Sequence, residues 1–267
     1  MSHESAAREG IVLLDLGNSS TCFGVACAGK LVDTWSVATR AELTCDEAEL
    51  SLLTFLDSRC PGIEIVDSAM CSVVPTLTSA WAGALERVAG RRPLTVGPGL
   101  KSGLKMRLSN PADLGADRVA DCVAAKKLYG APVMVVDFGT ATNIEVIDED
   151  GVLLGGMIAP GLHLAATAVS QAAAQLPLVE LKTPKSVIGT TTRDAMQSGI
   201  VIGEVARIDG LIEAAWRELG YETQVIATGS DAEAMTALSQ RIDAADDLLG
   251  LKGLLLLHKL NRPGKRK

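Results

Sequence analysis

An apolar run that ends in Asp-x-Gly occurs twice in this chain, and this repeat restricts the fold more than any other feature. The first copy, IVLLDLGNSSTCFGV, begins at Ile11, and the second, VMVVDFGTATNIEVI, begins at Val133. In both copies four apolar residues precede the aspartate, and a glycine, a small polar cluster and a second apolar run follow it. The two aspartates, Asp15 and Asp137, are separated by the length of a small domain. The repeat therefore indicates a duplicated domain whose copies have diverged.

Each copy predicts a β-hairpin with a tight turn made of glycine and hydroxyl residues. Such turns bind phosphate, because glycine lets the backbone approach closely and the N–H groups and hydroxyls of the turn donate hydrogen bonds. The carboxylate at the strand end can hold a cation, directly or through water. The alternative is that each aspartate only caps its own turn. The hydroxyl residues of the two copies are Ser19, Ser20, Thr21, Thr140 and Thr142.

The composition narrows the class of protein. A length of 267 residues suits one large or two medium domains, and 48% apolar with 21% charged residues predicts a folded chain with a sizeable core. A net charge of −7 works against attraction to nucleic acid or anionic lipid, so we expect no nucleic-acid partner. The six cysteines contain no C-x-x-C pair and the three histidines are scattered, so no zinc pattern is present. The first residues, MSHESAARE, lack the order of a secretory signal, and we expect reduced thiols in a cytoplasmic protein.

Residues 151–179 contain no Asp, Glu, Lys or Arg and are long enough to span a bilayer. A membrane helix is nevertheless disfavoured by the pairs Gly155-Gly156 and Pro160-Gly161, by His163 and by the polar residues that follow. The segment instead predicts a strand, a turn at Pro160-Gly161 and a buried Ala-rich helix. We therefore expect no membrane partner.

Residues 110–130 predict a helix that Asn110-Pro111 starts and Asp113 caps. Asp117 and Arg118 fall in its first turns. These two residues are either a favourable charge near a helix N-terminus and an ion-pair partner of Asp121, or part of a functional site. Strands near residues 30–37, 64–74 and 224–231 and helices near 45–57 and 76–90 complete the expected elements.

Four motifs follow one another along the chain. They are Asp15-Leu16-Gly17-Asn18, Gly115-Ala116-Asp117-Arg118, Asp137-Phe138-Gly139-Thr140-Ala141 and Gly155-Gly156-Met157-Ile158-Ala159-Pro160-Gly161. Further segments are CSVVPTLT, VGPGLKSGL, IGTTTRDAMQSG and the closing GLLLLHKLN. In this order the motifs resemble those of type III pantothenate kinases, and the resemblance spans about residues 11–261.

The resemblance implies an α/β fold of two ribonuclease-H-like domains, as in actin and sugar kinases, with ATP in the cleft between them. Residues 1–10 would be a disordered extension. Residues 11–130 would form the first domain with phosphate loop 1, and residues 131–267 the second domain with phosphate loop 2. The final helix is expected to pack back on the first domain.

The resemblance also implies ATP-dependent phosphorylation of pantothenate to 4′-phosphopantothenate, the first step of coenzyme A biosynthesis, by a homodimer. Mg²⁺ would accompany ATP, Asp117 would be the base for the primary hydroxyl of pantothenate, and Asp137 would hold a monovalent cation, K⁺ or NH₄⁺. Thr192 would contact the substrate across the dimer interface. The residues implied to bind ATP are Asp15, Leu16, Gly17, Asn18, Ser19, Ser20, Thr21, Cys22 and Thr140. Those implied to bind pantothenate are Gly115, Ala116, Asp117, Arg118 and Thr192.

One departure from the family pattern lies near the expected substrate. Leu108-Ser109 precedes Asn-Pro where the family usually has Tyr-Asp, and that tyrosine contacts pantothenate. A kinase for a different small hydroxyl acceptor is therefore an alternative. Two others are a regulator that resembles the Bvg accessory factor and an actin-like ATPase. The regulator is disfavoured because the chain retains four residues, Asp15, Asp117, Arg118 and Asp137. The Gly-Ala-Asp-Arg motif argues against the ATPase.

Overall fold

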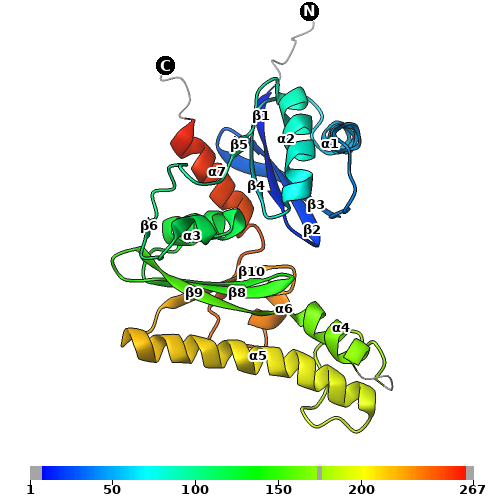
Figure 1. Cartoon of the computed structure of the whole chain (residues 1–267), viewed down its shortest axis with the longest axis vertical. Coiled ribbons are helices and arrows are strands. Elements are labelled where there is room, and N and C mark those ends of the chain that lie inside the picture. The colour runs from blue at the N-terminus through cyan, green and yellow to red at the C-terminus, as the bar shows by residue number, and fades with distance from the viewer. Residues whose placement is uncertain (1–7, 173–175, 263–267) are drawn as a thin grey trace, which may run out of the picture. The chain divides into compact units, whose positions relative to one another are not determined.

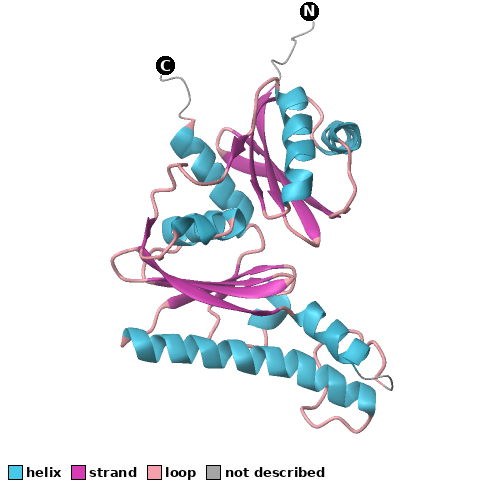
Figure 2. Ribbon diagram, in the orientation of Figure 1, coloured by secondary structure: helices cyan, strands magenta, loops and turns pink. Residues whose placement is uncertain are grey.

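The computed structural model describes residues 8–172 and 176–262, which form two compact units. Unit 1 comprises the residues up to Gly103, Ser109–Ala124 and the residues from Leu249 onward. Unit 2 comprises Leu104–Leu108 and Ala125–Leu248. Figure 1 colours the chain by residue number, and Figure 2 distinguishes its strands from its helices.

The units differ from a simple division after residue 130. Leu104–Leu108 belong to unit 2 because strand β6 (Lys105–Met106) pairs with β9 (Val152–Pro160) in the sheet of that unit. The boundary after Ala124 falls inside helix α3 (Ala116–Leu128). The residues from Leu249 belong to unit 1 because helix α7 (Leu249–Asn261) packs against strands of its sheet.

The expected extension at residues 1–10 is only partly covered by the structure. Residues 1–7 lie outside the described residues. Arg8–Gly10 are not an extension but the first residues of strand β1 (Arg8–Leu16), where they pair in parallel with the start of β4 (Ile63–Ser72).

Unit 1 contains a five-stranded sheet in the order β3-β2-β1-β4-β5. β1 and β2 form the predicted antiparallel hairpin, and β4 and β5 continue the sheet in parallel. Because side chains alternate between the faces of a strand, Val12, Leu14 and Leu16 pack into one core with α1 and α2, whereas α7 contacts the sheet through Leu251 beside Gly24. The other bounds are β2 Ser20–Cys27, β3 Lys30–Ala38, β5 Leu94–Thr95, α1 Cys45–Arg59 and α2 Pro75–Ala89.

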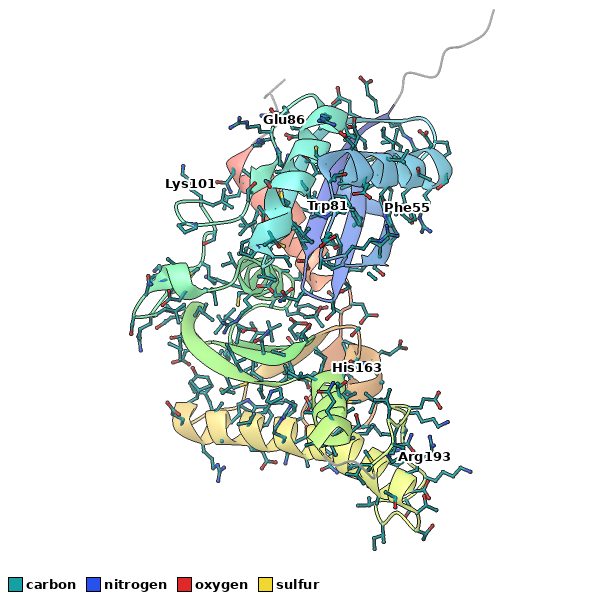
Figure 3. The ribbon with its side chains drawn as sticks, turned by 45° about the vertical axis from the view of Figure 1, so that its right-hand side comes forward. Phe55, Trp81, Glu86, Lys101, His163 and Arg193 are labelled. Carbon is teal, nitrogen blue, oxygen red and sulfur yellow. The ribbon has the colours of Figure 1, made fainter. Side chains whose placement is uncertain are left out.

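Aromatic side chains concentrate in the core of unit 1. The ring of Phe23 stacks on that of Trp35 and meets that of Trp81 edge-on, both with centroids 5.2 Å apart. The ring of Phe55, from α1, stacks on that of Trp35 with centroids 5.5 Å apart. Figure 3 labels Phe55 and Trp81. The rings of Trp35 and Trp81 therefore pack on one shared neighbour, Phe23.

Unit 2 contains a six-stranded sheet in the order β11-β10-β7-β8-β9-β6. The long helix α5 (Thr192–Leu219) covers one face, where Val201, Val205 and Ile208 pack with strand residues such as Val136 and Ile144 (Figure 1). The other bounds are β7 Val133–Phe138, β8 Ala141–Ile147, β10 Gln224–Gly229, β11 Ala244–Ala245, α4 Leu162–Ala172 and α6 Ala232–Thr236.

The two sheets share one topology. β3-β2-β1-β4-β5 of unit 1 corresponds, strand by strand, to β9-β8-β7-β10-β11 of unit 2. In each unit the first three strands are antiparallel neighbours and the last two run parallel to the first. The duplication predicted from the repeated Asp-x-Gly motif is confirmed at the level of strand order.

The helix predicted over residues 110–130 has a later start. Pro111–Asp113 form a separate 3₁₀ turn, η1, which Asn110 caps by accepting a hydrogen bond from the N–H of Ala112 at 3.2 Å. Asp113 is therefore not the cap of the long helix. Leu114 is extended, with φ −75° and ψ 122°, so the α-helix begins only at Ala116.

The uncharged segment at residues 151–179 forms the predicted strand, β9, and the predicted helix, α4, with residues 173–175 outside the described residues. The helix is not buried as predicted: Leu162 and Ala166 are covered, but Leu164 and Val169 are 48% and 39% exposed. Within residues 8–172 and 176–262, no helix has both the length and the apolar character to cross a membrane.

Candidate active site

The hairpin loop of unit 1, which we call loop 1 (Gly17–Ser20), connects β1 to β2. It is closed by a hydrogen bond from the N–H of Gly17 to the carbonyl oxygen of Ser20, at 3.0 Å. Asn18, Ser19 and Ser20 are exposed, whereas Thr21 is buried. Loop 1 therefore presents exposed polar residues on a fixed strand end, as phosphate binding requires.

Asp15 is the last polar residue of β1 before loop 1. In the sheet it lies between Cys22 of β2 and Cys71 of β4. The Cys71 thiol donates a hydrogen bond of 3.1 Å to Asp15 Oδ1. Burial raises the pKa of Asp15 to about 6, the thiol opposes this shift, and the charge of Asp117 adds to it. Burial, then the charge of Asp15, raises the pKa of Cys71 well above its usual value, so the thiol stays protonated and can donate.

Four of the predicted substrate residues lie at the start of helix α3 in unit 1. Gly115 directly precedes the helix, and its first three residues are Ala116, Asp117 and Arg118. Asp117 lies in the first turn, and its Oδ1 accepts a hydrogen bond of 2.7 Å from the N–H of Arg118. Its influence on the pKa values of Asp15 and Cys71 shows that its charge lies near both groups. Unit 1 thus brings the candidate base and Asp15, the aspartate before loop 1, into one acidic region.

Helix α7 borders the same region. A side chain at Gly250 would come 3.2 Å from Asp15 Oδ2 and 3.2 Å from Asp121 Oδ1, so the two carboxylates reach one point beside the start of α7. Asp121 is 5% exposed and lies one turn after Asp117 on α3. Glycine at position 250 allows this close approach, which any larger residue would crowd.

The hairpin loop of unit 2, which we call loop 2 (Gly139–Ala141), is built in a similar way. The N–H of Gly139 donates to the carbonyl oxygen of Ala141 at 3.2 Å, and Thr140 is exposed. The N–H of Gly161 donates to the carbonyl oxygen of Thr140 at 3.1 Å. A side chain at Gly161 would overlap the carbonyl oxygens of Gly139 and Thr140, which explains a glycine at this position.

Asp137 occupies in unit 2 the position that Asp15 occupies in unit 1. In the sheet it lies between Asn143 of β8 and Thr228 of β10. Its carboxylate lies beside the backbone of Gly139 and Gly229, which have no side chains to cover it. Carboxylate, hydroxyl and carbonyl oxygens are the donors that hard cations prefer, so the chemistry of this position fits the predicted cation.

Thr192 lies apart from these residues along the chain and begins α5. The preceding Thr191 caps the helix by accepting a hydrogen bond of 3.1 Å from the N–H of Asp194. Thr192 is exposed, and Figure 3 labels its neighbour Arg193 at the end of α5 that extends beyond the strands of unit 2. Within unit 2, the predicted residues thus fall into two groups: Asp137 with Thr140, and Thr192.

Side chains alone form no metal site in the part of the chain that the structure describes. Among residues 8–172 and 176–262, no group of three or more His, Cys, Asp or Glu side chains could hold a metal ion.

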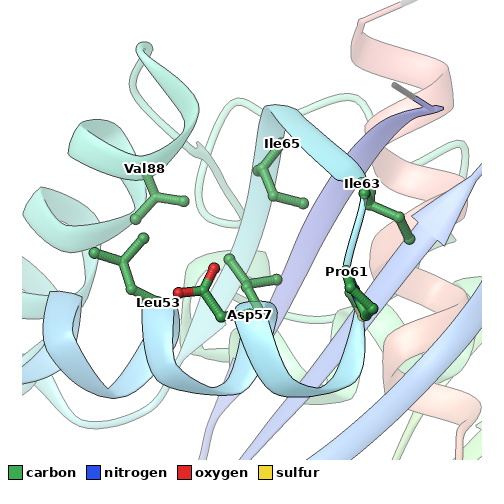
Figure 4. A pocket seen from close by; sticks show the side chains of 9 residues that line it. Leu53, Asp57, Pro61, Ile63, Ile65 and Val88 are labelled. Atoms are coloured by element: carbon green, nitrogen blue, oxygen red, sulfur yellow. The ribbon is translucent and has the colours of Figure 1, made fainter. Parts of the chain in front are cut away.

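A hollow of about 470 Å³ lies between α1, α2 and β4 of unit 1 (Figure 4). It contains none of the predicted site residues, and the residues labelled there are Leu53, Asp57, Pro61, Ile63, Ile65 and Val88.

The sequence alone did not single out Cys71, Asp121 or Gly250 as neighbours of Asp15. Cys71 belongs to the strand that runs parallel to β1, and parallel strands end at one edge of a sheet. The strand predicted at 64–74 contains Cys71, but β4 ends at Ser72, two residues earlier than predicted, so only the structure gives the register that places Cys71 beside Asp15. No sequence signal pointed to Gly250, because its role depends on how α7 packs.

Solved structures similar to this chain have the fold that the sequence predicts. A Campylobacter jejuni protein assigned to the Baf family of transcriptional activators aligns with a TM-score of 0.60 and 20% identity, over 94% of this chain and 98% of that one. A ROK hexokinase from Thermus thermophilus aligns with a TM-score of 0.52 and 14% identity, over 94% and 98%. At these identities the likeness concerns the fold alone, and it confirms the two-domain, actin-like fold of sugar kinases.

The sequence comparisons identify the family. The family model for type III pantothenate kinase matches residues 11–214. The type III pantothenate kinase of Halalkalibacterium halodurans is 38% identical over 252 residues, which cover 94% of this chain and 99% of that protein. The corresponding protein of Listeria monocytogenes is 38% identical over 258 residues, or 96% and 100% of the two chains. This chain therefore belongs to the type III pantothenate kinase family.

Proposed function

We propose that this protein transfers the γ-phosphoryl group of ATP to the primary hydroxyl of pantothenate, which forms 4′-phosphopantothenate and ADP in the first step of coenzyme A biosynthesis. One observation carries the proposal: within unit 1, Asp117, the candidate base, is held in the first turn of α3 by the Arg118 N–H, and its charge acts on Asp15, which precedes loop 1 on β1. A kinase of this family needs a proton acceptor beside its phosphate loop, and unit 1 contains both.

In the proposed reaction Asp117 accepts a hydrogen bond from the pantothenate hydroxyl and takes its proton as the oxygen attacks the γ-phosphorus. The bond between that phosphorus and the oxygen of ADP breaks. Phosphoryl transfer passes through a loose transition state, so alignment and charge neutralisation contribute more than base strength. A carboxylate whose Oδ1 is already held by the N–H of Arg118 meets this need, because it is oriented before the substrate binds.

The proposal assigns phosphate binding to the N–H groups and hydroxyls of loop 1, with Thr140 of loop 2 as a further donor. Asp137 would hold the monovalent cation, K⁺ or NH₄⁺, and Asp15 would contact the Mg²⁺ that accompanies ATP, directly or through water. When bound, these ions neutralise negative charge on the phosphates. One or two carboxylates suffice for Mg²⁺ that arrives with a nucleotide, because Mg²⁺ keeps several of its waters.

We further propose that the active form is a cytoplasmic homodimer in which unit 2 forms the interface. Support comes from apolar side chains that one chain leaves exposed in this unit. They include Leu178, Val187 and Ile188, which are 68%, 69% and 81% exposed. Thr192 follows this segment directly, so a partner at this surface would be near it.

The decisive experiment measures ADP release by the purified protein with and without pantothenate, in K⁺, NH₄⁺ and Na⁺. The proposal requires release that depends on pantothenate and is faster in K⁺ or NH₄⁺ than in Na⁺, with 4′-phosphopantothenate detected by mass spectrometry. Release that ignores pantothenate would identify an ATPase. No release would favour an accessory protein, and release only with another hydroxyl compound would favour a different acceptor.

The dimer is tested separately by light scattering on the wild-type protein and on Ile188→Asp. We expect a dimer for the wild type and a monomer for the variant, because a charge on an apolar interface is costly. A wild-type monomer at assay concentration, with full activity, would contradict the dimer proposal and leave the kinase proposal unaffected.

A further inference from the structure

Both loops are held by the residue that follows the strand after their hairpin, which is β3 in unit 1 and β9 in unit 2. In unit 2, Gly161 follows β9, and its N–H donates to the carbonyl oxygen of Thr140 just before β8. In unit 1, Thr39 follows β3, and its N–H donates to the carbonyl oxygen of Ser19 just before β2, at 3.0 Å. The same backbone hydrogen bond therefore recurs at equivalent positions of the duplicated fold.

Thr39 adds a side chain where Gly161 has none. The Thr39 hydroxyl donates to the carbonyl oxygen of Gly17 at 2.7 Å. It also lies 2.9 Å from the hydroxyl of Thr21. Because a threonine hydroxyl has one proton and Thr39 gives it to Gly17, Thr21 is the donor in the second bond. Three hydrogen bonds thus join Thr39 to its neighbours: two reach loop 1, and the third reaches Thr21 near the start of β2.

The bond to Gly17 has a consequence for phosphate binding. In a trans peptide the carbonyl group and the following N–H point in opposite directions. The peptide between Gly17 and Asn18 is trans, so holding the carbonyl oxygen of Gly17 on Thr39 directs the N–H of Asn18 away from Thr39. Asn18 is exposed, so a ligand in the solvent can reach this residue.

We infer that Thr39 is a positioning residue for ATP: its hydroxyl fixes the peptide between Gly17 and Asn18 so that the Asn18 N–H is oriented for a phosphate oxygen before the nucleotide binds. The inference rests on the proposed function, in which loop 1 binds the phosphates. Orientation before binding reduces the entropy that binding must overcome, so the effect should fall on ATP affinity and not on the chemical step.

The test compares Thr39→Val, which keeps the shape but loses the hydroxyl, with Thr39→Ser, which keeps the hydroxyl. For Thr39→Val we expect the KM for ATP to rise about ten-fold, which corresponds to about 1.4 kcal/mol, with kcat and the KM for pantothenate changed less than about two-fold. Thr39→Ser should restore the wild-type KM. Thr39→Ala replaces Thr39→Val should the latter fail to fold, with the same expectation.

Thr54→Val is the matched control. The Thr54 hydroxyl also donates to a backbone carbonyl, that of Leu50 at 2.7 Å, but within helix α1. This variant should keep the wild-type KM for ATP. An unchanged KM in Thr39→Val would overturn the inference, as would a Thr39→Ser variant as impaired as Thr39→Val, since only packing would then matter.

Direct titration of ATP into the wild type and Thr39→Val separates this inference from the proposed function. Wild-type protein that binds ATP but shows no pantothenate-dependent ADP release would contradict the proposed function alone. A Thr39→Val variant that binds ATP as tightly as the wild type would contradict the positioning role alone.

Discussion

Loop 1 and loop 2 occupy equivalent positions in two sheets of one topology, yet they differ in length and in support. Loop 1 has four residues between the last paired positions, Leu16 and Thr21, and loop 2 has three between Phe138 and Thr142. The longer loop 1 leaves room for the side chain of Thr39, which follows β3. The shorter loop packs so closely on Gly161 that any side chain there would overlap it.

The aspartates that precede the two loops also differ in the side chains that surround them. Asp15 lies between two cysteines and near Asp117, and burial raises its pKa. Asp137 lies between Asn143 and Thr228, whose side chains are polar. Duplication has thus kept the strand framework while the side chains around each aspartate have diverged. We expect the difference in chemistry to reflect a difference in task, with the acceptor chemistry in unit 1 and the cation in unit 2.

The largest expected effect tests whether unit 1 alone supplies the base. Asp117→Asn keeps the size of the side chain and an oxygen for the Arg118 N–H, but it cannot accept the proton. We expect kcat to fall by about 10²–10⁴, the usual contribution of a general base, with an unchanged melting temperature. Steady-state ADP release and a thermal unfolding curve measure the two quantities.

Asp113→Asn is the control for charge near this helix. Asp113 is exposed and accepts a hydrogen bond of 2.7 Å from the Asn110 side chain in the separate 3₁₀ turn. Its replacement should leave turnover within about two-fold of wild type, since surface charges contribute little. Near-normal turnover in Asp117→Asn would show that Asp117 is not the base. It would also contradict the proposal that unit 1 supplies the acceptor chemistry and unit 2 the cation.

The strand framework was predictable from the sequence because each strand run ends at a glycine, a proline or a small polar cluster. The hairpins at Ile11 and Val133 and helix α1 lie where the residue pattern places them. The start of α3 was not predictable from the sequence, because Asn-Pro begins a 3₁₀ turn as readily as an α-helix. In the structure the extended Leu114 separates the 3₁₀ turn from the α-helix. The burial of α4 was wrongly predicted, since an uncharged helix is buried only where another element covers it.

The candidate site was predictable where it lies within one motif. The sequence motifs gave Asp15, Asp117, Asp137 and both loops. The motifs did not give the neighbours that distant segments contribute: Cys71 through strand pairing, Gly250 through helix packing, and Thr39 at the end of β3, 22 residues after Gly17. Each depends on tertiary structure that no local pattern records.

The next effect concerns the cation in unit 2. Asp137→Asn removes the charge beside Gly139 and Gly229 but keeps the shape. We expect activity in K⁺ to fall about 10–100-fold, toward the level in Na⁺, as when a group that tunes a metal site is lost. Asp150→Asn, in the exposed turn between β8 and β9, should keep the response to K⁺. Full K⁺ stimulation in Asp137→Asn would contradict the assignment of the cation to this residue.

A smaller effect tests the different supports of the two loops. Gly161→Ala would force a methyl group against the carbonyl oxygens of Gly139 and Thr140, and we expect a loss of stability of about 1–3 kcal/mol by urea unfolding. Gly203→Ala is the control in the same unit, because Gly203 lies within helix α5 and its added methyl meets no atom within 4 Å apart from the adjacent backbone of that helix. That variant should be as stable as wild type or slightly more so. Equal stability of both variants would show that loop 2 tolerates a side chain as loop 1 does.

The smallest effect tests the buried setting of Asp15. Its pKa in the folded protein, about 6, is higher than the ordinary 3.8 of an unfolded chain. The folded state therefore binds the proton more tightly, and this contribution to stability is complete below about pH 4 and is lost as the pH rises through 6. Asp15→Asn is neutral at every pH and still offers an oxygen to the Cys71 thiol. We expect the variant to be about 1–2 kcal/mol more stable than wild type at pH 8, with the difference vanishing toward pH 4, while activity falls. A variant less stable than wild type at pH 8 would show that the ionised carboxylate is well accommodated, and the contrast between the two aspartates would then lie in function and not in burial.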